Sequence, residues 1–439
     1  MSMLPMSPLV MGEDGGLVQA KFAVAVGIDV HAQALVCAAD WFDFSDQSAK
    51  QQCRTFGTSQ SELAQFSEWV CSFKPLRVVM ESTGVLWISA YEALEDAGLD
   101  NRQLLLANPR AVKGVSGHKT DTNDSLHLAQ LARLDAVEGS FVPARDIREM
   151  RLIARAYIRA KESFAQEKNR KTKYLNAVGT RAGSVFSNIH GVAASKILTS
   201  WLNEDPNLEE VIERNSKRLK HSAEEIADVL APVSRGVRSM IQLQKVLIES
   251  HRKYCSELMT LLKSMQKPYK KWIDLLMTIP CMKETSARLV FAELGPNLST
   301  FATICKFCSW AGLSPRVKES AGKQARGLRA VKGNRWLRKT LVEVANGIAL
   351  SRRGYLREVF QKFKERRGRN KAIVALAHKL LRIIYAMFKR KQQYIERPEE
   401  VMKQFRAKRL ARSAKQADCL GLEWTGRQVV DRASGEVLV

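Results

Sequence analysis

Four carboxylates have the types and positions that a metal-dependent phosphodiester enzyme needs. Asp29 lies at the end of an apolar run and Glu81 ends another, while Asp121 and Asp124 stand three residues apart at the start of a helical stretch. Two divalent cations about 4 Å apart need several oxygen ligands that converge on one point. Strand ends at the carboxyl edge of a sheet, together with one helix face, supply such ligands. Each acid alone is more often a solvated strand end or helix cap, but four in one acidic segment favour a metal site.

The charge of the chain is unevenly divided and indicates what such a site acts on. Residues 1–140 contain 10 Lys and Arg against 17 Asp and Glu, whereas residues 141–439 contain 60 against 28. An acidic segment suits metal binding, and a long basic segment attracts polyphosphate through the release of counterions. The apolar content of 45% over 439 residues excludes a mainly disordered chain and suffices for two or three domains.

The cysteines and the apolar runs indicate where the protein works. Eight cysteines without a paired framework are typical of free thiols in a reducing cytoplasm. Cys305 and Cys308 form a single CxxC, for which packing within a helix is favoured over a zinc site. The first twenty residues lack a basic segment followed by an apolar one, and no apolar run reaches about 18 residues. Neither export nor membrane insertion is therefore expected.

The apolar periodicity predicts the elements that carry the acids. After a leader, residues 1–21, the expected elements are strands 22–30, 33–41 and 53–57, helix 60–72, strand 76–81, helix 85–97, strand 103–107 and helix 122–136. Three strands followed by alternating helices and strands indicate an RNase H-like mixed sheet, which holds carboxylates at these strand and helix ends. This α/β domain is expected to span residues 22–144.

Residues 145–270 change to long helical patterns with few Gly or Pro and predict an extended helical or coiled-coil connector. Four arginines within it share one helical stripe: Arg148, Arg151, Arg155 and Arg159. Such a stripe can track a phosphate backbone, and a solvated helix face is an equally weighted alternative.

Residues 271–392 hold a second chemical signal. Leu275 to Pro280, followed by Thr285 to Leu294, predicts a helix, a tight turn and a helix, the shape of a hairpin that grips a DNA backbone. Serine beside small residues follows in a loop, among the basic residues Lys323, Arg326, Arg329, Lys332, Arg335 and Arg338. Nearby cations stabilise an alkoxide, so a serine here is a candidate nucleophile. From this segment alone, a helix-capping serine in a basic loop is favoured.

A dense basic cluster follows the candidate serine. Residues 352–391 contain 14 Lys and Arg against two Glu and include Arg366, Arg367 and Arg369. This density exceeds that of an ordinary solvated face and predicts contact with nucleic-acid phosphates. Trp310 and Trp336 could stack on bases, although buried core positions are favoured for both. A tail, residues 393–439, ends the chain.

Taken together, the motifs resemble the transposases of the insertion-sequence 110 family, in particular its longer 1111-type branch, with the Piv-type DNA invertases as relatives. The matching segments are GIDVHAQ, VVMESTG, ANPRAVKGVSGHKTDTNDSLHLAQL and, further on, LMTIP, AELG, FCSWAGLSPRVKESAGK and KGNRWLRKTL. The resemblance implies an RNase H/RuvC-like domain, and after the connector a mainly helical Tnp domain with a nucleophilic serine.

Roles for single residues follow from the same resemblance. By position it implies that Mg²⁺, with Mn²⁺ as an alternative, binds Asp29, Glu81, Asp121 and Asp124. It implies that Ser320 attacks a DNA phosphate and forms a covalent phosphoserine intermediate, with Ser309 and Ser314 as fallback candidates. His31, two residues after Asp29, is expected to hydrogen-bond near the metal site rather than to ligate.

The family resemblance also implies partners. It predicts a homo-oligomer, a dimer or tetramer, whose composite active sites join acids and serine from different subunits. A bridge RNA encoded by the element is expected to pair with donor and target DNA, so that base pairing selects the sequence. The bacterial cytoplasm, in association with the nucleoid, is the expected location.

Two positions depart from the family pattern. The hairpin commonly reads Ile-Pro-Gly-Ile-Gly, and here Cys281 and Lys283 replace the two glycines. Lys283 is then a candidate for the phosphate contact, and Ala321 replaces the glycine that usually follows the serine, which requires a negative φ. The sequence predicts an RNA-guided, metal-dependent DNA transposase. The alternatives are a structure-specific nuclease of the Holliday-junction type, which needs only the acids and water, and a non-catalytic nucleic-acid-binding protein.

Overall fold

The structure is a computed structural model of the chain. It describes residues 9–11, 17–81, 84–107, 121–230, 232–314, 319–320, 323–324 and 333–396, together with a set of residues between 403 and 437 that includes two short strands. Contacts divide the chain into two compact units, the N-terminal unit Met1–Arg145 and the C-terminal unit Asp146–Val439. The border lies where the α/β domain was predicted to end, and the finer division into five segments stays a prediction.

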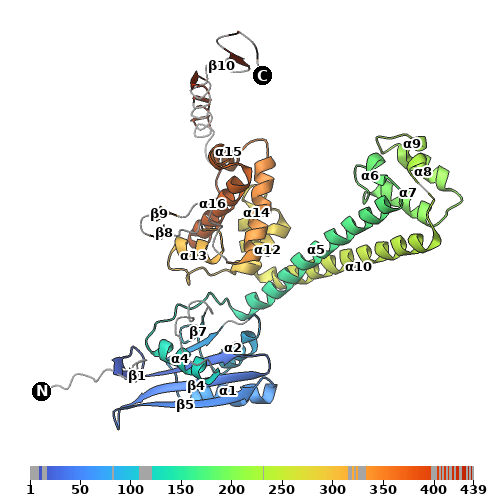
Figure 1. The fold of residues 1–439 in the computed structure, drawn as a ribbon. Helices are drawn as coiled ribbons and strands as arrows, with labels where there is room; N and C mark the ends of the chain where they lie inside the picture. The colour runs from blue at the N-terminus through green and yellow to red at the C-terminus, as the bar shows by residue number, and fades with distance from the viewer. Residues whose placement is uncertain are drawn as a thin grey trace. The chain divides into compact units, whose positions relative to one another are not determined.

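The N-terminal unit combines strands and helices (Figure 1). Its strands are β1 (Leu9–Met11), β2 (Leu17–Gln19), β3 (Val24–Val30), β4 (Ala34–Asp43), β5 (Ser48–Gly57), β6 (Arg77–Glu81) and β7 (Leu104–Ala107). Its described helices are α1 (Gln60–Ser72), α2 (Trp87–Asp96) and α4 (Asp121–Arg133).

Strands β3 to β7 form one mixed sheet in the order β5-β4-β3-β6-β7. The first three, β3, β4 and β5, pair antiparallel, whereas β6 and β7 run parallel to β3. Three antiparallel strands in sequence order, extended on the β3 side by parallel crossover strands, are the RNase H/RuvC-like arrangement. The predicted fold class is therefore confirmed.

Strand β5 is longer than the sequence predicts. It spans Ser48–Gly57 rather than 53–57, because a tight turn brings Ser48 opposite Asp43 and the ladder continues from there. Apart from Phe56, its side chains are exposed or half-buried. An edge strand with one buried side chain lacks the apolar alternation by which a strand is detected in a sequence.

The two faces of the sheet pack on different helices. Ile28 and Met80 lie in a core that includes residues of α1 and α2. Ala25 and Val79 lie in a second core with Leu128 of α4. Since side chains alternate between the faces of a strand, this division assigns each residue of β3 and β6 to one of the two cores.

The C-terminal unit is mainly helical (Figure 1). Its elements are α5 (Arg145–Ala177), which begins at the border, α6 (Ala182–Val185), α7 (Val192–Leu202), α8 (Leu208–Ser216), α9 (Ala223–Val229), α10 (Arg235–Met265), the 3-10 turn η1 (Lys267–Tyr269), α11 (Lys270–Met277), α12 (Glu284–Leu294), α13 (Ile304–Trp310), β8 (Glu319–Ser320), β9 (Lys323–Gln324), α14 (Arg335–Leu350), α15 (Tyr355–Arg367), α16 (Arg369–Arg390), β10 (Leu422–Trp424) and β11 (Val429–Asp431).

Helices α5 and α10 form the predicted helical connector. The 33 residues of α5 correspond to a helix of roughly 50 Å. The two helices run side by side (Figure 1), and Gln244 of α10 donates a hydrogen bond of 3.3 Å to the carbonyl of Glu167 on α5. Around Leu175 and Ile241, the short helices α6 to α9 add a small core of their own.

The predicted helix, tight turn and helix is confirmed as α11 and α12 with a turn between them. Met282 donates its backbone N–H to the carbonyl of Ile279 at 3.0 Å, which closes the turn. Cys281 adopts a left-handed backbone with φ of 62°. The cysteine thus keeps the conformation that favours glycine at this position. Of the described helices, none combines the length and the apolar character needed to cross a membrane.

Candidate active site

Asp29 and Glu81 lie on neighbouring parallel strands. Ile28 of β3 pairs with Met80 of β6 in the strand register, so the residues that follow them, Asp29 and Glu81, stand side by side. Strand β6 ends at Glu81, and β3 ends one residue after Asp29. Both acids therefore lie at the carboxyl edge of the sheet, where open α/β sheets bind ligands.

Side-chain alternation directs both carboxylates to one face. Ile28 and Met80 belong to the core under α1 and α2, so Asp29 and Glu81 point to the opposite face, which α4 covers. Asp29 is 8% exposed and Glu81 is half-buried.

Helix α4 packs directly on β3 at Gly27. A Cβ atom at Gly27 would lie 2.1 Å from the carbonyl oxygen of Ser125 and 2.4 Å from the backbone nitrogen of Ala129. Only glycine permits an approach this close between a helix and a strand. Gly27 and Asp29 are two residues apart and share a face, so the helix turn around Ser125 lies beside Asp29.

The direction of α4 follows from its last residue. The carbonyl of Arg133 accepts hydrogen bonds of 3.0 Å from the backbone N–H groups of Lys21 and Phe22, just before β3 begins. The carboxyl end of α4 thus lies at the start of β3, and its first turn points to the end of β3 that carries Asp29. Asp124 in that first turn is half-buried. Asp121 begins the helix, and its side chain lies outside the described residues.

A buried ion pair holds α4 on the sheet. The guanidinium of Arg133 donates to the carboxylate of Asp40 on β4, and neither side chain is exposed. A second nitrogen of Arg133 donates to the carbonyl of Phe22 at 3.2 Å. Burial raises the pKa of Asp40, and the Arg133 guanidinium opposes that shift. The pair fixes the helix that carries Asp121 and Asp124.

His31 lies next to the first acid. Its Nε2 atom is 3.2 Å from Oδ2 of Asp29, and its side chain is 42% exposed. This distance fits the predicted hydrogen bond beside the acidic site. A histidine in this position can orient the Asp29 carboxylate.

The acids of this site are all carboxylates, the donors that hard divalent cations prefer. Within the described part of the chain, no three His, Cys, Asp or Glu side chains are grouped closely enough to hold a metal ion. The Asp121 side chain is not among those compared. The strand register and the direction of α4 bring the backbones of Asp29, Glu81 and Asp124 to one edge, and the donor chemistry fits a divalent cation.

Ser320 lies in a short hairpin rather than in the predicted loop. Strands β8 and β9 pair antiparallel, with Ser320 opposite Lys323. The side chains of both residues lie outside the described residues. The fallback Ser309 is exposed on α13, and Ser314 is half-buried after that helix.

The arginine stripe of α5 contacts its own chain. Arg148 is 4% exposed. Arg151 and Arg155 both bind Glu293 on α12, and Arg159 lies over the ring of Trp336 at 5.3 Å. Neither the phosphate-tracking surface nor the solvated face predicted from the sequence describes such a stripe. The physical reason is that a buried carboxylate and an indole ring on neighbouring helices supply partners that the α5 sequence does not reveal.

Glu293 is a residue that sequence reasoning missed. It is 1% exposed and receives guanidinium groups from Arg151 and Arg155. Burial lowers the pKa of Arg151 to about 10 and the Glu293 carboxylate opposes this shift, so the guanidinium stays charged at neutral pH. The available signal was an acid within an apolar helix, in the segment LVFAELG, because such an acid needs a cationic partner.

The basic residues around Ser320 are only partly described. Arg326, Arg329 and Lys332 lie outside the described residues, as does the Lys323 side chain. Arg335 is exposed and its guanidinium lies 4.2 Å from the centre of the Trp336 ring. Arg338 is half-buried. Trp336 is 8% exposed, which agrees with the core position favoured for it.

Arg366, Arg367 and Arg369 form an exposed cluster where α15 meets α16. Gly368 between the helices has φ of 73°, which turns the chain sharply and sets the three arginines around one corner. Cations at the end of α15 also complement its helix dipole, so part of this arrangement serves the helix itself.

Cys305 and Cys308 lie in α13, where Cys308 is buried and Cys305 is exposed. Burial raises the pKa of the Cys308 thiol to about 11. Both observations agree with packing within a helix.

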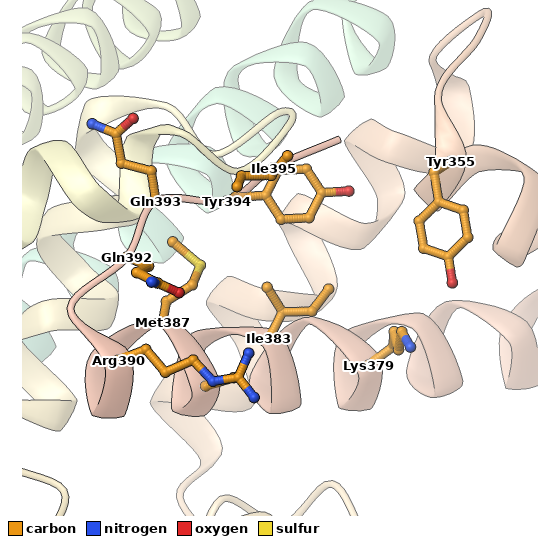
Figure 2. Close-up of a pocket in the computed structure, with 10 residues that line it drawn as sticks. Tyr355, Lys379, Ile383, Met387, Arg390, Gln392, Gln393, Tyr394 and Ile395 are labelled. Atoms are coloured by element: carbon orange, nitrogen blue, oxygen red, sulfur yellow. The ribbon is translucent and has the colours of Figure 1, made fainter. Parts of the chain in front are cut away.

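A pocket of about 310 Å³ lies between the carboxyl half of α16 and residues 392–395 (Figure 2). Its wall includes Tyr355, Lys379, Arg390 and Tyr394. The predicted site residues that the structure describes lie elsewhere.

Similar solved structures include Thermus thermophilus RuvC. One is RuvC in complex with a Holliday junction substrate, 17% identical, covering 27% of this chain and 99% of that chain at a TM-score of 0.20. A second RuvC structure is 15% identical, with the same coverage and a TM-score of 0.21. The fold assignment rests on the strand order described above and not on these two likenesses.

Comparisons of sequence identify relatives. A protein of Pseudomonas aeruginosa strain PAO1 described as a probable family 20 transposase is 24% identical over 349 residues, covering 76% of this chain and 90% of that protein. Residues 26–179 match the family model of the DEDD transposases of IS110 type, described as transposase. Residues 273–361 match the model described as transposase IS116/IS110/IS902 family. Together the two models cover more than half of the chain, which belongs to the IS110 family of transposases.

Proposed function

We propose that this chain is an RNA-guided DNA recombinase that cuts and rejoins donor and target DNA through a phosphoserine intermediate. Asp29, Glu81, Asp121 and Asp124 would hold Mg²⁺ or Mn²⁺, and Ser320 would be the nucleophile. The convergence of Asp29, Glu81 and the first turn of α4 at one edge of an RNase H-like sheet supports the metal site.

The proposed chemistry divides between the two parts of the chain. The Ser320 hydroxyl oxygen forms a bond to a DNA phosphorus, the bond from that phosphorus to a sugar oxygen breaks, and the freed sugar oxygen takes up a proton. Attack by the DNA hydroxyl of the other strand reverses this step and rejoins the strands. Divalent cations supply charge stabilisation at the reacting phosphate. Asp29, Glu81 and Asp124 provide the negative charge that holds them, and His31 orients Asp29.

Nucleic acid and RNA guidance are supported by charge and by the family. The excess of Lys and Arg in residues 141–439 provides for phosphate contacts, and Arg366, Arg367 and Arg369 are exposed to make them. Base pairing by a bridge RNA would select the donor and target sequences, as it does in other guided systems.

A stripe on α10 supports the proposed homo-oligomer. Large apolar side chains follow heptad-like spacing on the exposed face of the helix: Met240, Leu243, Leu247, Tyr254 and Leu261. A second stripe, one residue further on, is buried: Ile241, Gln244, Ile248, Cys255 and Leu262. Since the buried stripe is the one occupied within the chain, the exposed stripe suits a helix from a second copy.

A nuclease that resolves DNA junctions is the second candidate. All four acids lie in the N-terminal unit, so this unit alone carries what a water-activating nuclease needs. Such an enzyme would not use Ser320.

The metal site can be tested with Asp29→Asn and Asp124→Asn. Each substitution removes a charged ligand, so we expect strand cleavage in Mg²⁺ to be abolished while the folded state and DNA binding remain. Asp135→Asn is the matched control, because Asp135 lies in the same unit but pairs with Lys21 and Arg77. Undiminished recombination by both site variants would contradict the metal-site assignment.

A further inference from the structure

Glu293 joins the connector helix α5 to the chain segment that carries Ser320. Its carboxylate accepts two hydrogen bonds from Arg155, at 2.7 Å and 2.9 Å. Arg151 lies 3.4 Å from the same carboxylate and donates a 2.6 Å hydrogen bond to the Glu293 carbonyl. Asn334 donates from Nδ2 to the Glu293 carboxylate at 2.7 Å. One buried acid thus binds two helical arginines and an asparagine at once.

Asn334 marks the point where the serine segment ends. Its Oδ1 atom accepts the backbone N–H groups of Trp336 and Leu337, each at 3.1 Å, and so caps α14. Its own backbone N–H donates to the carbonyl of Trp310 at 2.9 Å. The Asn334 side chain therefore holds the start of α14 and Glu293 together, while its backbone binds the end of α13.

The beginning of the serine segment meets its end at the same place. A Cβ atom at Gly333 would lie 2.3 Å from the backbone nitrogen of Gly312 and 2.5 Å from the carbonyl oxygen of Trp310. Arg151 also lies over the Trp310 ring, 5.6 Å from its centre. The backbone positions before and after the segment are thus in contact, and Arg151 contacts one of them.

Helix α5 makes two more contacts along the same row. Arg159 lies over Trp336, and Glu162 pairs with Lys339 of α14 at 2.5 Å. Positions 155, 159 and 162 follow helical spacing, so one face of α5 lies along the start of α14. A shift of α5 against α14 would therefore disturb the Glu293 cluster and both ends of the serine segment.

We infer that Glu293, with Arg151, Arg155 and Asn334, is a positioning cluster that sets the reach of Ser320 by holding both ends of its segment to α5. The inference rests on the proposed role of Ser320 as nucleophile. A displacement of about 1 Å at a reacting group can lower a rate by about 10²-fold. Loss of the cluster therefore acts on the rate of attack and leaves DNA affinity to the basic surface.

Two substitutions test the cluster. Glu293→Gln keeps the shape of the side chain but removes the charge that the arginines bind. Asn334→Ser keeps a good helix cap while removing the hydrogen bond to Glu293, so it serves if the first variant fails to fold. Glu284→Gln is the matched control, because Glu284 begins the same helix and pairs with Lys263 and Arg288 away from the serine segment.

Each full-length variant is compared by the rate of covalent DNA–protein adduct formation, DNA affinity, thermal midpoint and the rate of tryptic cleavage within residues 314–333. We expect the two cluster variants to form adduct about 10²-fold more slowly with unchanged DNA affinity, and Glu284→Gln to match the parent chain. Parent-like adduct rates in folded Asn334→Ser, or an equal loss in Glu284→Gln at a similar thermal midpoint, would overturn the inference.

The trypsin readout separates this inference from the proposed function. If the parent chain forms no adduct at Ser320, the nucleophile assignment fails. Faster cleavage within 314–333 in the cluster variants than in Glu284→Gln would then still support the hold of the cluster on the segment. Equal cleavage rates in all variants would overturn that hold as well.

Discussion

Arg133 of α4 and Asp40 of β4 form an ion pair in which neither side chain has solvent-exposed surface. Arg133→Met leaves the Asp40 carboxylate buried without its cation, so we expect the free energy of unfolding to fall by about 3–5 kcal/mol. Urea denaturation of the full chain measures this change.

The double variant Arg133→Met with Asp40→Leu removes both charges and should recover much of the loss. Lys21→Ala is the control, because it breaks a pair with Asp135 in which the lysine side chain is 62% exposed. That variant should cost no more than about 1 kcal/mol. A loss as large as that of Arg133→Met would show that burial is not the cause.

Cys281 is strained by its left-handed backbone, with φ of 62°. Cys281→Gly removes the Cβ clash and should raise the free energy of unfolding by up to about 1 kcal/mol. Cys305→Gly, at another exposed cysteine but within α13, should lower it by about 1 kcal/mol. Chemical denaturation that gives both variants the same sign would contradict the conformational explanation.

The cluster Arg366, Arg367 and Arg369 should contribute to nucleic-acid affinity through counterion release. Reversal of the three charges should weaken binding and flatten the plot of log affinity against log salt by about three contacts. Binding titrations between ~50 and ~200 mM salt measure the slope.

The same reversal at Lys217, Arg218 and Lys220, three exposed cations at the end of α8, is the matched control. Its slope should change less. Equal slopes in the parent chain and in the variant at 366, 367 and 369 would assign that cluster to the solvated surface and the helix dipole.

The exposed stripe of α10 should hold two copies of the chain together. Leu243→Glu places a charge in the middle of the stripe, so we expect a lower molar mass by light scattering at the same protein concentration. Val192→Glu is the control, since Val192 on α7 has the same 71% exposure as Leu243. An unchanged mass in Leu243→Glu would place the oligomer interface elsewhere.

Much of the N-terminal unit could be predicted from the sequence, because its information is local. β3 and β6 are apolar runs that each carry an acid near their end, and their parallel register brings Asp29 and Glu81 side by side. What could not be predicted was the edge. Most of β5 has no buried side chain, so its first residues pair with β4 without leaving an apolar pattern.

The partners of charged residues were the other limit. The spacing of Arg151 and Arg155 correctly implied a shared helix face, but that face meets Glu293, more than a hundred residues away. Likewise Arg133 and Asp40 show no sign of each other in the sequence. Periodicity predicts which residues share a face, whereas the tertiary structure decides whether that face meets solvent, phosphate or a buried carboxylate.

The nucleophile is tested most directly by the fate of cut DNA. DNA cleaved under conditions that block rejoining should remain attached to the protein, and mass spectrometry of the digested adduct should place the nucleotide on Ser320, with no adduct in Ser320→Ala. Free DNA ends made equally well by Ser320→Ala would contradict the account and assign the cleavage to water activated at the acidic site.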